Sequence, residues 1–272
     1  DIGNELFKLF LDDTMMYSSA YYETPSMNLA QAAVAKLDLV CNKLQLNAAD
    51  HLLEIGTGWG GLAIHAARNY GCKVTTTTIS EEQYRLATDK VKKEGLEDRI
   101  NVVKQDYRDL SGEYDKLVSI EMIEAIGHQY MDTYFKKCAS LLKPDGMMLI
   151  QAITIREQLY DNALKDVDFI KKYIFPGGFL PSVTAMLDTV ATHTDMKLFH
   201  LQDIGPHYAK TLKDWRVSFF SKLDKVRKLG YSEEFIRLWE YYFCYCEGGF
   251  IERDIGTVQM LLTRPENRRS PV

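Results

Sequence analysis

Hydrophobic and polar positions along the first half of the chain predict strands and helices that follow one another in turn. The run HLLEI at 51–55 is short and apolar, and KVTTTTI at 73–79 is rich in β-branched residues, as is typical of buried strands. Further strands are predicted at 100–105, 116–122, 146–153 and 255–263, and helices at 60–69, 81–94 and 130–142. This alternation predicts an α/β fold with a parallel sheet covered by helices on both faces.

Two regions depart from the alternation. Residues 4–11 and 26–45 show a helical pattern of apolar positions, so residues 1–45 are predicted to form an amino-terminal helical segment. Residues 157–250 are predicted to be largely helical and are rich in aromatic side chains. We expect 157–250 to be an insertion that caps the carboxyl ends of the strands, where open α/β sheets bind ligands, and the whole chain, 1–272, to be one domain.

Composition narrows the class of protein. With 272 residues, 46% hydrophobic and 26% charged, the chain is typical of a globular protein with an ample core. Its net charge of −5 gives no reason to expect a nucleic-acid partner. No apolar run approaches the length of a membrane span and no signal peptide is recognised, which predicts a cytoplasmic protein. The five cysteines are odd in number and scattered, which predicts buried free thiols and suggests no metal site.

The stretch LLEIGTGWGG at 52–61 ends a predicted strand in glycines and opens a helix. Gly56, Gly58, Gly60 and Gly61 would let a ligand lie against the main chain, and the start of the helix offers free N–H groups. A dinucleotide is disfavoured, because the carboxylate of Glu54 would repel a pyrophosphate. The next strand also lacks the acidic residue that holds a ribose in dinucleotide sites. The sulfonium and ammonium of S-adenosylmethionine suit this carboxylate better; a tight turn without a ligand is the alternative.

Two further stretches follow strand ends and are candidates for ligand contact. In ISEEQ, Ser80 and Gln83 have the spacing of a capping box for the next helix, which explains them structurally, and a contact with a ligand is open in addition. In QDYRDL, Asp106 and Tyr107 would stand where a purine ring could stack and form hydrogen bonds.

Eight segments together carry a resemblance to a known family. They are DIGNELFKLFLDDTMMYSSAYYE, LLEIGTGWGGLAIHAA, TTTISEEQ, QDYRDL, YDKLVSIEMIEAIG, YIFPGGFLPS, HYAKTLKDWR and WEYYFCYCEGGF. In this order, over residues 1–263, the chain resembles the cyclopropane-fatty-acyl-phospholipid synthase family of S-adenosylmethionine-dependent transferases, which includes the mycolic acid cyclopropane synthases. It is most similar to the branch that contains the catalytic domain of the plant enzymes. The family usually has His-Tyr before the Asp-x-Gly-Asn segment, here at residue 1, so we expect a trimmed or shortened start.

The resemblance implies a Rossmann-like class I methyltransferase fold with a mostly parallel seven-stranded sheet. It implies transfer of a methylene or methyl group from S-adenosylmethionine to the double bond of an unsaturated acyl chain of a phospholipid, with closure of a cyclopropane ring. It also implies peripheral association with a membrane surface and allows a homodimer.

Other functions stay open at this point. A methyl- or methylene-branched product is one, and methylation of a small amine is another. Related N-methyltransferases usually carry Glu-His where this chain has Glu124 and Ala125, which counts against an amine. A domain that binds the cofactor and only senses lipid is a third, and loss of Glu124 or Tyr208 would have favoured it.

By the same resemblance, a bound bicarbonate serves as the base that removes a proton from the new methyl group. Its ligands would be the side chains of Glu124, Gln151 and Tyr208, with the main chain of Ser19 and Ile153. Bacterial members carry Cys at the position of Ser19 and His at that of Gln151. Glutamine cannot titrate, but it can donate a hydrogen bond to an anion.

The resemblance also assigns contacts with S-adenosylmethionine. These fall on Tyr17, Ser18, Gly56, Gly58, Thr78, Ile79, Ser80, Gln83 and Tyr107, with Glu54 and Asp106 as supporting contacts. Contact with the membrane surface is expected through apolar residues of the cap and of the amino-terminal helix. The candidates on the helix are Leu6, Phe7, Leu9 and Phe10, with Lys210, Lys213, Arg216 and Lys222 for anionic lipid.

Two site residues, Glu124 and Tyr208, have structural alternatives. The stretch VSIEMIEAIG is an apolar strand end that carries two acids, Glu121 and Glu124, and the Glu124 carboxylate could instead cap the following helix. Tyr208 could equally be a half-buried tyrosine whose hydroxyl bonds to any partner.

Overall fold

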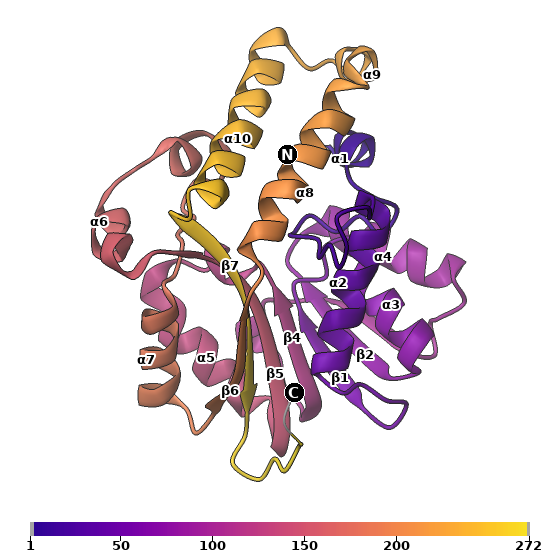
Figure 1. The fold of residues 1–272 in the computed structure, drawn as a ribbon. Helices are drawn as coiled ribbons and strands as arrows, with labels where there is room; N and C mark the ends of the chain where they lie inside the picture. Colours follow the sequence, from indigo (N-terminus) through magenta and orange to yellow (C-terminus); the bar gives the residue numbers. More distant parts are fainter. Residues whose placement is uncertain (1–2, 271–272) are drawn as a thin grey trace.

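The computed structural model describes residues 3–270 and shows a seven-stranded sheet with helices on both faces (Figure 1). The strand order is β3-β2-β1-β4-β5-β7-β6. The strands are β1 (His51–Ile55), β2 (Lys73–Thr78), β3 (Ile100–Lys104), β4 (Tyr114–Ile120), β5 (Leu142–Ile155), β6 (Lys197–Asp203) and β7 (Ile255–Thr263). Among the described strands, β7 alone points in the opposite direction to the others, so β5 and β6 both pair with it in antiparallel fashion. The predicted fold class is confirmed.

Buried apolar side chains on both faces explain this layering. The helices of the chain are α1 (Asn4–Phe10), α2 (Leu29–Lys43), α3 (Gly61–Tyr70), α4 (Glu81–Lys93), α5 (Met131–Ser140), α6 (Tyr160–Lys165), α7 (Val183–His193), α8 (Gly205–Phe220), α9 (Leu223–Lys228) and α10 (Glu233–Ile251). One core lies between the sheet and α2 and α3, and includes Leu37 and Leu62. Another lies between the sheet and α5 and α7, and includes Phe135 and Met186. The described part of the predicted helical segment 1–45 supplies α1 and α2.

Residues 157–250 differ from the expected continuous cap. Within this range, α7 packs on the sheet through Met186 and Val190, and β6 pairs with β7 at the sheet edge. No strand was predicted at β6, because KLFHLQD is an edge strand whose residues are exposed or half-buried and therefore lacks an apolar run. The cap is thus made of two separate parts, 156–182 and 204–251.

The second part of the cap encloses an aromatic core of its own. Helices α8 and α10 extend beyond the end of the sheet, with α1 beside α8 (Figure 1). Trp215, Phe219, Trp239 and Phe243 are at most 1% exposed and pack with Phe10 of α1. This contact joins the amino-terminal segment to the cap.

The thiols only partly match the expectation. Cys41, Cys72 and Cys138 are buried and free, Cys246 is half-buried, and Cys244 is exposed on α10. Among residues 3–270, no group of three or more His, Cys, Asp or Glu is arranged to hold a metal ion. No helix within that range has the length and apolar character to cross a bilayer.

Candidate active site

Two different physical requirements explain the glycines in the turn after β1: the backbone angles of the turn and the close approach of another segment. Gly56, Gly58 and Gly60 have φ angles of 104°, 52° and 82°, in the left-handed region that favours glycine. A Cβ atom at Gly58 would meet nothing within 4 Å, so the main chain there borders open space. A Cβ at Gly61 would lie 2.5 Å from the carbonyl oxygen of Thr14. Gly58 therefore suits a ligand, whereas Gly61 is required by packing of the amino-terminal segment.

Glu54 supports this turn from within the protein. Its side chain is 3% exposed, and the Thr76 hydroxyl lies 2.6 Å from Glu54 Oε2 and 2.7 Å from the Thr57 hydroxyl. Burial raises the pKa of Glu54 to about 8. Through Thr76, the carboxyl group of Glu54 holds Thr57, the second residue of the turn, in place. Because the raised pKa favours the neutral form, Glu54 attracts a cationic ligand less than its position in the sequence suggests.

Buried Glu54 leads to a prediction about pH and stability. The unfolded chain releases this proton near pH 4.5, whereas the folded protein keeps it up to about pH 8. Between these values the folded state holds more protons, so Glu54 makes stability fall as pH rises. Glu54→Gln should therefore raise the melting temperature relative to wild type at pH 8 more than at pH 5. Glu97→Gln, at an exposed position, is the control; equal behaviour of the two variants at both pH values would contradict the assignment.

The end of β2 places its candidate residues at the same edge of the sheet as the glycine turn. The Thr78 hydroxyl donates to Gln83 Oε1 at 2.8 Å, and Ser80 Oγ accepts from Gln83 N at 3.3 Å. The predicted capping box is therefore only half formed, because the Gln83 side chain turns to Thr78. Ile79 is 76% exposed.

After β3, an ion pair holds the next candidate in place. Arg108 Nη2 lies 2.7 Å from Asp106 Oδ2, and this contact holds the pKa of Asp106 below its usual range. Tyr107 packs edge-on against Tyr134. Because β1, β2 and β3 are parallel neighbours, all these residues share one edge of the sheet.

The segment 17–19 connects this edge to the end of β4. The hydroxyl of Tyr17 lies 2.9 Å from that of Tyr242 on α10, and Ser18 Oγ accepts from the buried Lys36 at 3.0 Å. The N–H of Ser19 donates to Glu121 Oε1 at 3.0 Å. The tertiary structure thus joins a residue near the amino terminus to the acid after β4.

The expected anion ligands converge on Glu121. Besides Ser19, Gln151 Nε2 donates to Glu121 Oε1 at 2.8 Å, and the Tyr208 hydroxyl donates to Oε2 at 2.8 Å. Glu124 lies apart from these donors: its Oε1 accepts from Ile153 N at 2.5 Å, and its Oε2 is buried without a partner among residues 3–270. The five residues that the resemblance singled out do come together, but three of them bond to an acid to which the sequence assigned no role.

The two acids differ in their electrostatic surroundings. Burial and the neighbouring Glu121 raise the pKa of Glu124 to about 8. Burial also raises the pKa of Glu121, but its three hydrogen-bond donors and Lys36 oppose this. The charged form is therefore better stabilised on Glu121, and the proton of the pair resides on Glu124 at neutral pH.

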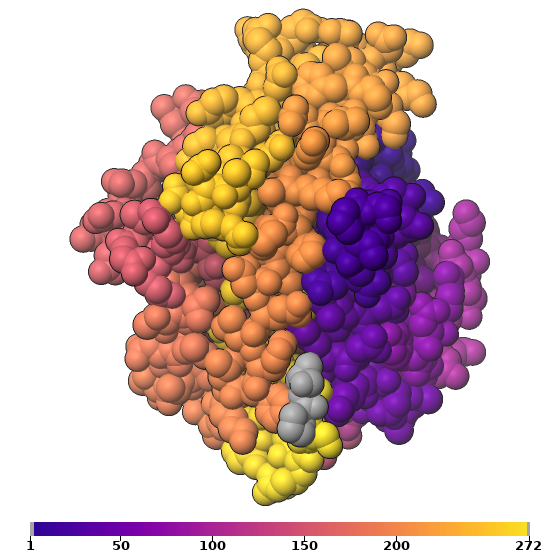
Figure 2. Space-filling model, in the orientation of Figure 1, coloured from indigo at the N-terminus to yellow at the C-terminus, as the bar shows by residue number. Residues whose placement is uncertain are grey.

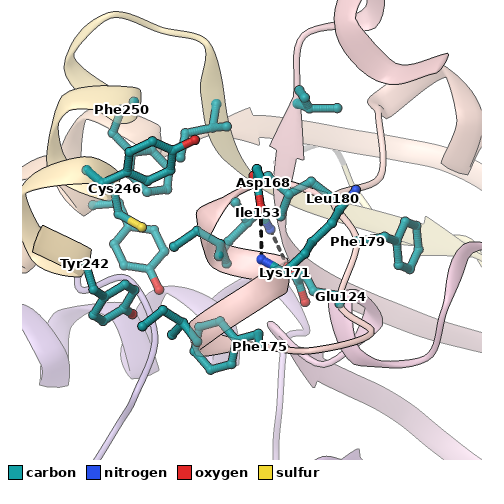
Figure 3. Close-up of a pocket in the computed structure, with 18 of the residues that line it drawn as sticks. Glu124, Ile153, Asp168, Lys171, Phe175, Phe179, Leu180, Tyr242, Cys246 and Phe250 are labelled. Carbon is teal, nitrogen blue, oxygen red and sulfur yellow. Dashed lines mark hydrogen bonds between the residues drawn. The ribbon is translucent and has the colours of Figure 1, made fainter. Parts of the chain in front are cut away.

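A largely apolar cavity of about 900 Å³ opens beside these acids. Its walls come from the end of β5, the segment 168–180, α8 and α10. Figure 3 shows Tyr242, Cys246 and Phe250 of α10 on one side and Phe179 and Leu180 on the other. Its polar residues include Glu121, Glu124 and Tyr208. The shape and lining suit a long apolar ligand with one reactive position beside the acids.

The named candidates for membrane contact need correction, whereas contact through apolar residues of the cap stays a prediction. Leu6, Phe7 and Phe10 are buried in the aromatic core, and Leu9 is half-buried. Three of the four basic candidates are bonded within the protein. Lys210 donates to Met27 O, Arg216 pairs with Glu247, and Lys222 donates to Leu9 O, while Lys213 is exposed.

Exposed apolar side chains lie instead on the two parts of the cap that line the cavity. This set, called the mouth surface here, consists of Val167, Tyr173, Phe175, Tyr241, Tyr245 and Ile251. Phe175 and Tyr245 also line the cavity. The ring of Phe169 lies 4.6 Å from that of Tyr241, so the segment 156–182 contacts α10. Figure 2 shows the segment 156–182 and α10 side by side.

The fold and the glycine turn are those of a Rossmann-like class I methyltransferase. The chain belongs to the mycolic acid cyclopropane synthetase family, whose sequence model matches residues 1–260. It is 40% identical over 271 residues to a tuberculostearic acid methyltransferase of Mycobacterium tuberculosis, and 39% over 264 residues to the cyclopropane-fatty-acyl-phospholipid synthase of Escherichia coli K12. These matches include 97% of this chain, which spans 63% and 66% of the two relatives' lengths.

A solved structure supports the same assignment. The mycolic acid cyclopropane synthase CmaA1, complexed with SAH and CTAB, superimposes with a TM-score of 0.89 at 30% sequence identity. The match covers 96% of this chain and 94% of that one.

Proposed function

We propose that the protein transfers a one-carbon unit from S-adenosylmethionine to the double bond of an unsaturated acyl chain of a phospholipid and closes a cyclopropane ring. The observation that carries this proposal is the apolar cavity that borders Glu121 and Glu124. An acyl chain fits such a lining, and the acids provide the one reactive position. The relative from E. coli, a cyclopropane-fatty-acyl-phospholipid synthase by name, supports the same substrate class.

The residues around the glycine turn fit the methyl donor. Gly58 leaves the main chain open, and Thr78, Gln83 and Asp106 present polar atoms at the same edge of the sheet. Tyr17 borders the cavity, and Ser19, two residues later, donates to Glu121. The segment 17–19 would therefore lie between the bound S-adenosylmethionine and the acyl chain. When bound, S-adenosylmethionine supplies a methyl group on a positively charged sulfur.

A branched product is the second candidate. The relative at 40% identity is named for a methyl-branched fatty acid, tuberculostearic acid. Both products need the same first bond between an alkene carbon and the methyl carbon. They differ in which proton is lost: loss from the new methyl group closes a ring, whereas loss of another proton leaves a methylene-branched chain, and a separate reductase would have to supply the hydride and proton that turn this into a methyl branch.

Mass spectrometry of lipids from cells that express the protein tests both products. With methyl-labelled methionine, unsaturated phospholipids should gain one labelled carbon. A ring should resist mild hydrogenation, a methylene branch should take up two hydrogens, and a saturated methyl branch should be two hydrogens heavier than the ring from the start. The purified protein should be stabilised by S-adenosylhomocysteine, by about 2.7 kcal/mol at one hundred times its dissociation constant, and not by NAD. Unlabelled lipids, or equal stabilisation by NAD, would refute the function.

Contact with a membrane is part of the proposal, because the substrate lies there. We expect the side chains of the mouth surface to insert into the bilayer surface, so that an acyl chain can enter the cavity from the membrane. Co-sedimentation with phosphatidylglycerol vesicles should fall about tenfold in the double variant Tyr173→Ser, Ile251→Ser, because two exposed apolar side chains are lost. Val34→Ser on α2, also at an exposed apolar position, is the matched control. Equal binding of both variants would refute this orientation.

A further inference from the structure

The ligand set that the resemblance assigned to bicarbonate is already occupied by a protein carboxylate. Ser19 N, Gln151 Nε2 and Tyr208 Oη each lie 2.8–3.0 Å from an oxygen of Glu121. A bicarbonate in the same place would lose these donors to Glu121 and would lie beside a second buried anion, which is unfavourable. The residues present therefore do not fit a bound bicarbonate.

A buried chain of hydrogen bonds determines which atom faces Glu121. Lys43 Nζ donates to Gln259 Oε1 at 2.7 Å, and Gln259 Nε2 donates to Gln151 Oε1 at 2.9 Å. Lysine has donors only, so the Gln259 oxygen must face Lys43 and its amide nitrogen must face Gln151. The same logic turns Gln151 Nε2 toward Glu121. Glu121 Oε1 is thus always presented with a donor, which suits an ionised carboxylate.

The sheet register holds this chain in place. Gln151 on β5 lies directly opposite Gln259 on β7, and Gln259 lies opposite Gln202 on β6, which also accepts from Lys43. Gln151 and Gln259 are fully buried, and Lys43 is 4% exposed. A buried lysine with neutral partners is costly, so its retention here is consistent with a role in orienting the amides.

The backbone of Glu121 is also unusual. Its φ angle is 49°, in the left-handed region that few residues other than glycine adopt, and its N–H donates to Gln151 O at 2.7 Å. Such a conformation persists only where the surroundings enforce it, and it occurs often at functional sites. Here it coincides with the residue whose carboxylate borders the cavity.

We propose that Glu121 is the catalytic residue that accepts the proton, in place of a bound bicarbonate; this rests on the proposed function. The electron pair of the acyl double bond forms a bond to the methyl carbon while the bond from that carbon to sulfur breaks. One C–H bond of the transferred methyl group then breaks. Its proton passes to an oxygen of Glu121, and its electron pair closes the ring. The proton leaves Glu121 to water before the next turnover.

Two variants of Glu121 test this assignment. Glu121→Gln keeps the shape and loses the charge, and it should lower the rate of product formation by about 10² to 10³ with little change in affinity for S-adenosylhomocysteine. Glu121→Gly vacates the space among the three donors, and glycine suits a φ of 49°. In CO₂-free buffer it should be as slow as Glu121→Gln, and added bicarbonate or formate should restore its rate at least about tenfold.

The wild-type protein supplies the decisive comparison. Its rate should be the same in CO₂-free buffer and in buffer with added bicarbonate. Dependence of the wild type on bicarbonate, or a near-wild-type rate for Glu121→Gln, would overturn the assignment of Glu121 while leaving product formation intact. Absence of any modified lipid from the wild type under both conditions would refute the proposed function itself, and with it the role of Glu121.

Discussion

Gly61→Ala is expected to weaken the binding of S-adenosylhomocysteine at least about tenfold and to destabilise the fold by about 1–3 kcal/mol. The new Cβ would lie 2.5 Å from Thr14 O and 3.0 Å from the sulfur of Met16. A backbone oxygen cannot move aside by a change of rotamer, so the chain at 14–16 must shift. Tyr17, Ser18 and Ser19 follow directly, and Ser19 donates to Glu121. One added methyl group should therefore disturb both the donor site and the acid.

Calorimetric titration and urea unfolding measure the two effects of Gly61→Ala. Gly3→Ala is the matched control, because its Cβ would have only an ordinary contact, 3.6 Å from the hydroxyl of Tyr231. If Gly61→Ala behaved like this control in both measurements, the close approach of Thr14 to α3 would be wrong.

Trp239→Ala should cost about 3–5 kcal/mol of unfolding free energy. The indole is 1% exposed, and the rings of Phe10, Phe235 and Phe243 lie 5.5 Å from it. Its removal leaves a large void between α1, α8 and α10, which the rigid helices cannot fill. Since Tyr242 of the same helix lines the cavity, product formation should fall together with stability.

Urea unfolding of three variants separates this effect from a general sensitivity of α10 and α8. Trp239→Phe keeps most of the apolar volume and should lose less than Trp239→Ala. Val217→Ala lies on α8 at a side chain that is 58% exposed, and should change stability by no more than about 0.5 kcal/mol. A loss in Trp239→Ala no larger than in Val217→Ala would show that the aromatic cluster does not hold the cap.

The pair Glu121 and Glu124 illustrates how two like groups can take different roles. Three donors stabilise the charge on Glu121, whereas Glu124 has one main-chain donor and an oxygen with no partner in the described part of the chain. Carboxyl groups whose surroundings separate their pKa values are typical of sites that hold and move a proton. With a protein carboxylate as the base, the reaction would not depend on the concentration of bicarbonate.

Local patterns in the sequence were sufficient for most of the fold. Residues 52–55 and 74–78 are buried on both faces, so the first shows as a mainly apolar run and the second as a run of β-branched residues, both visible without partners. The edge strand β6 was missed for the opposite reason, because its residues are at most half-buried. Leu6, Phe7 and Phe10 gave an apolar helix face, but that pattern cannot say whether a membrane or an aromatic core covers it.

The sequence by itself determined the alternating sheet, the glycine turn and the family, because these depend on residues that are close along the chain or on motifs in a set order. Only the tertiary structure decided which acid receives the donors. Ser19, Gln151 and Tyr208 lie 102, 30 and 87 residues from Glu121, and the chain from Lys43 to Gln151 crosses α2, β7 and β5. Hydrogen bonds depend on distances in space, which cannot be read from the spacing of residues along the chain. The sequence therefore does not distinguish Glu121 from Glu124, whereas in the folded protein their hydrogen-bond partners differ.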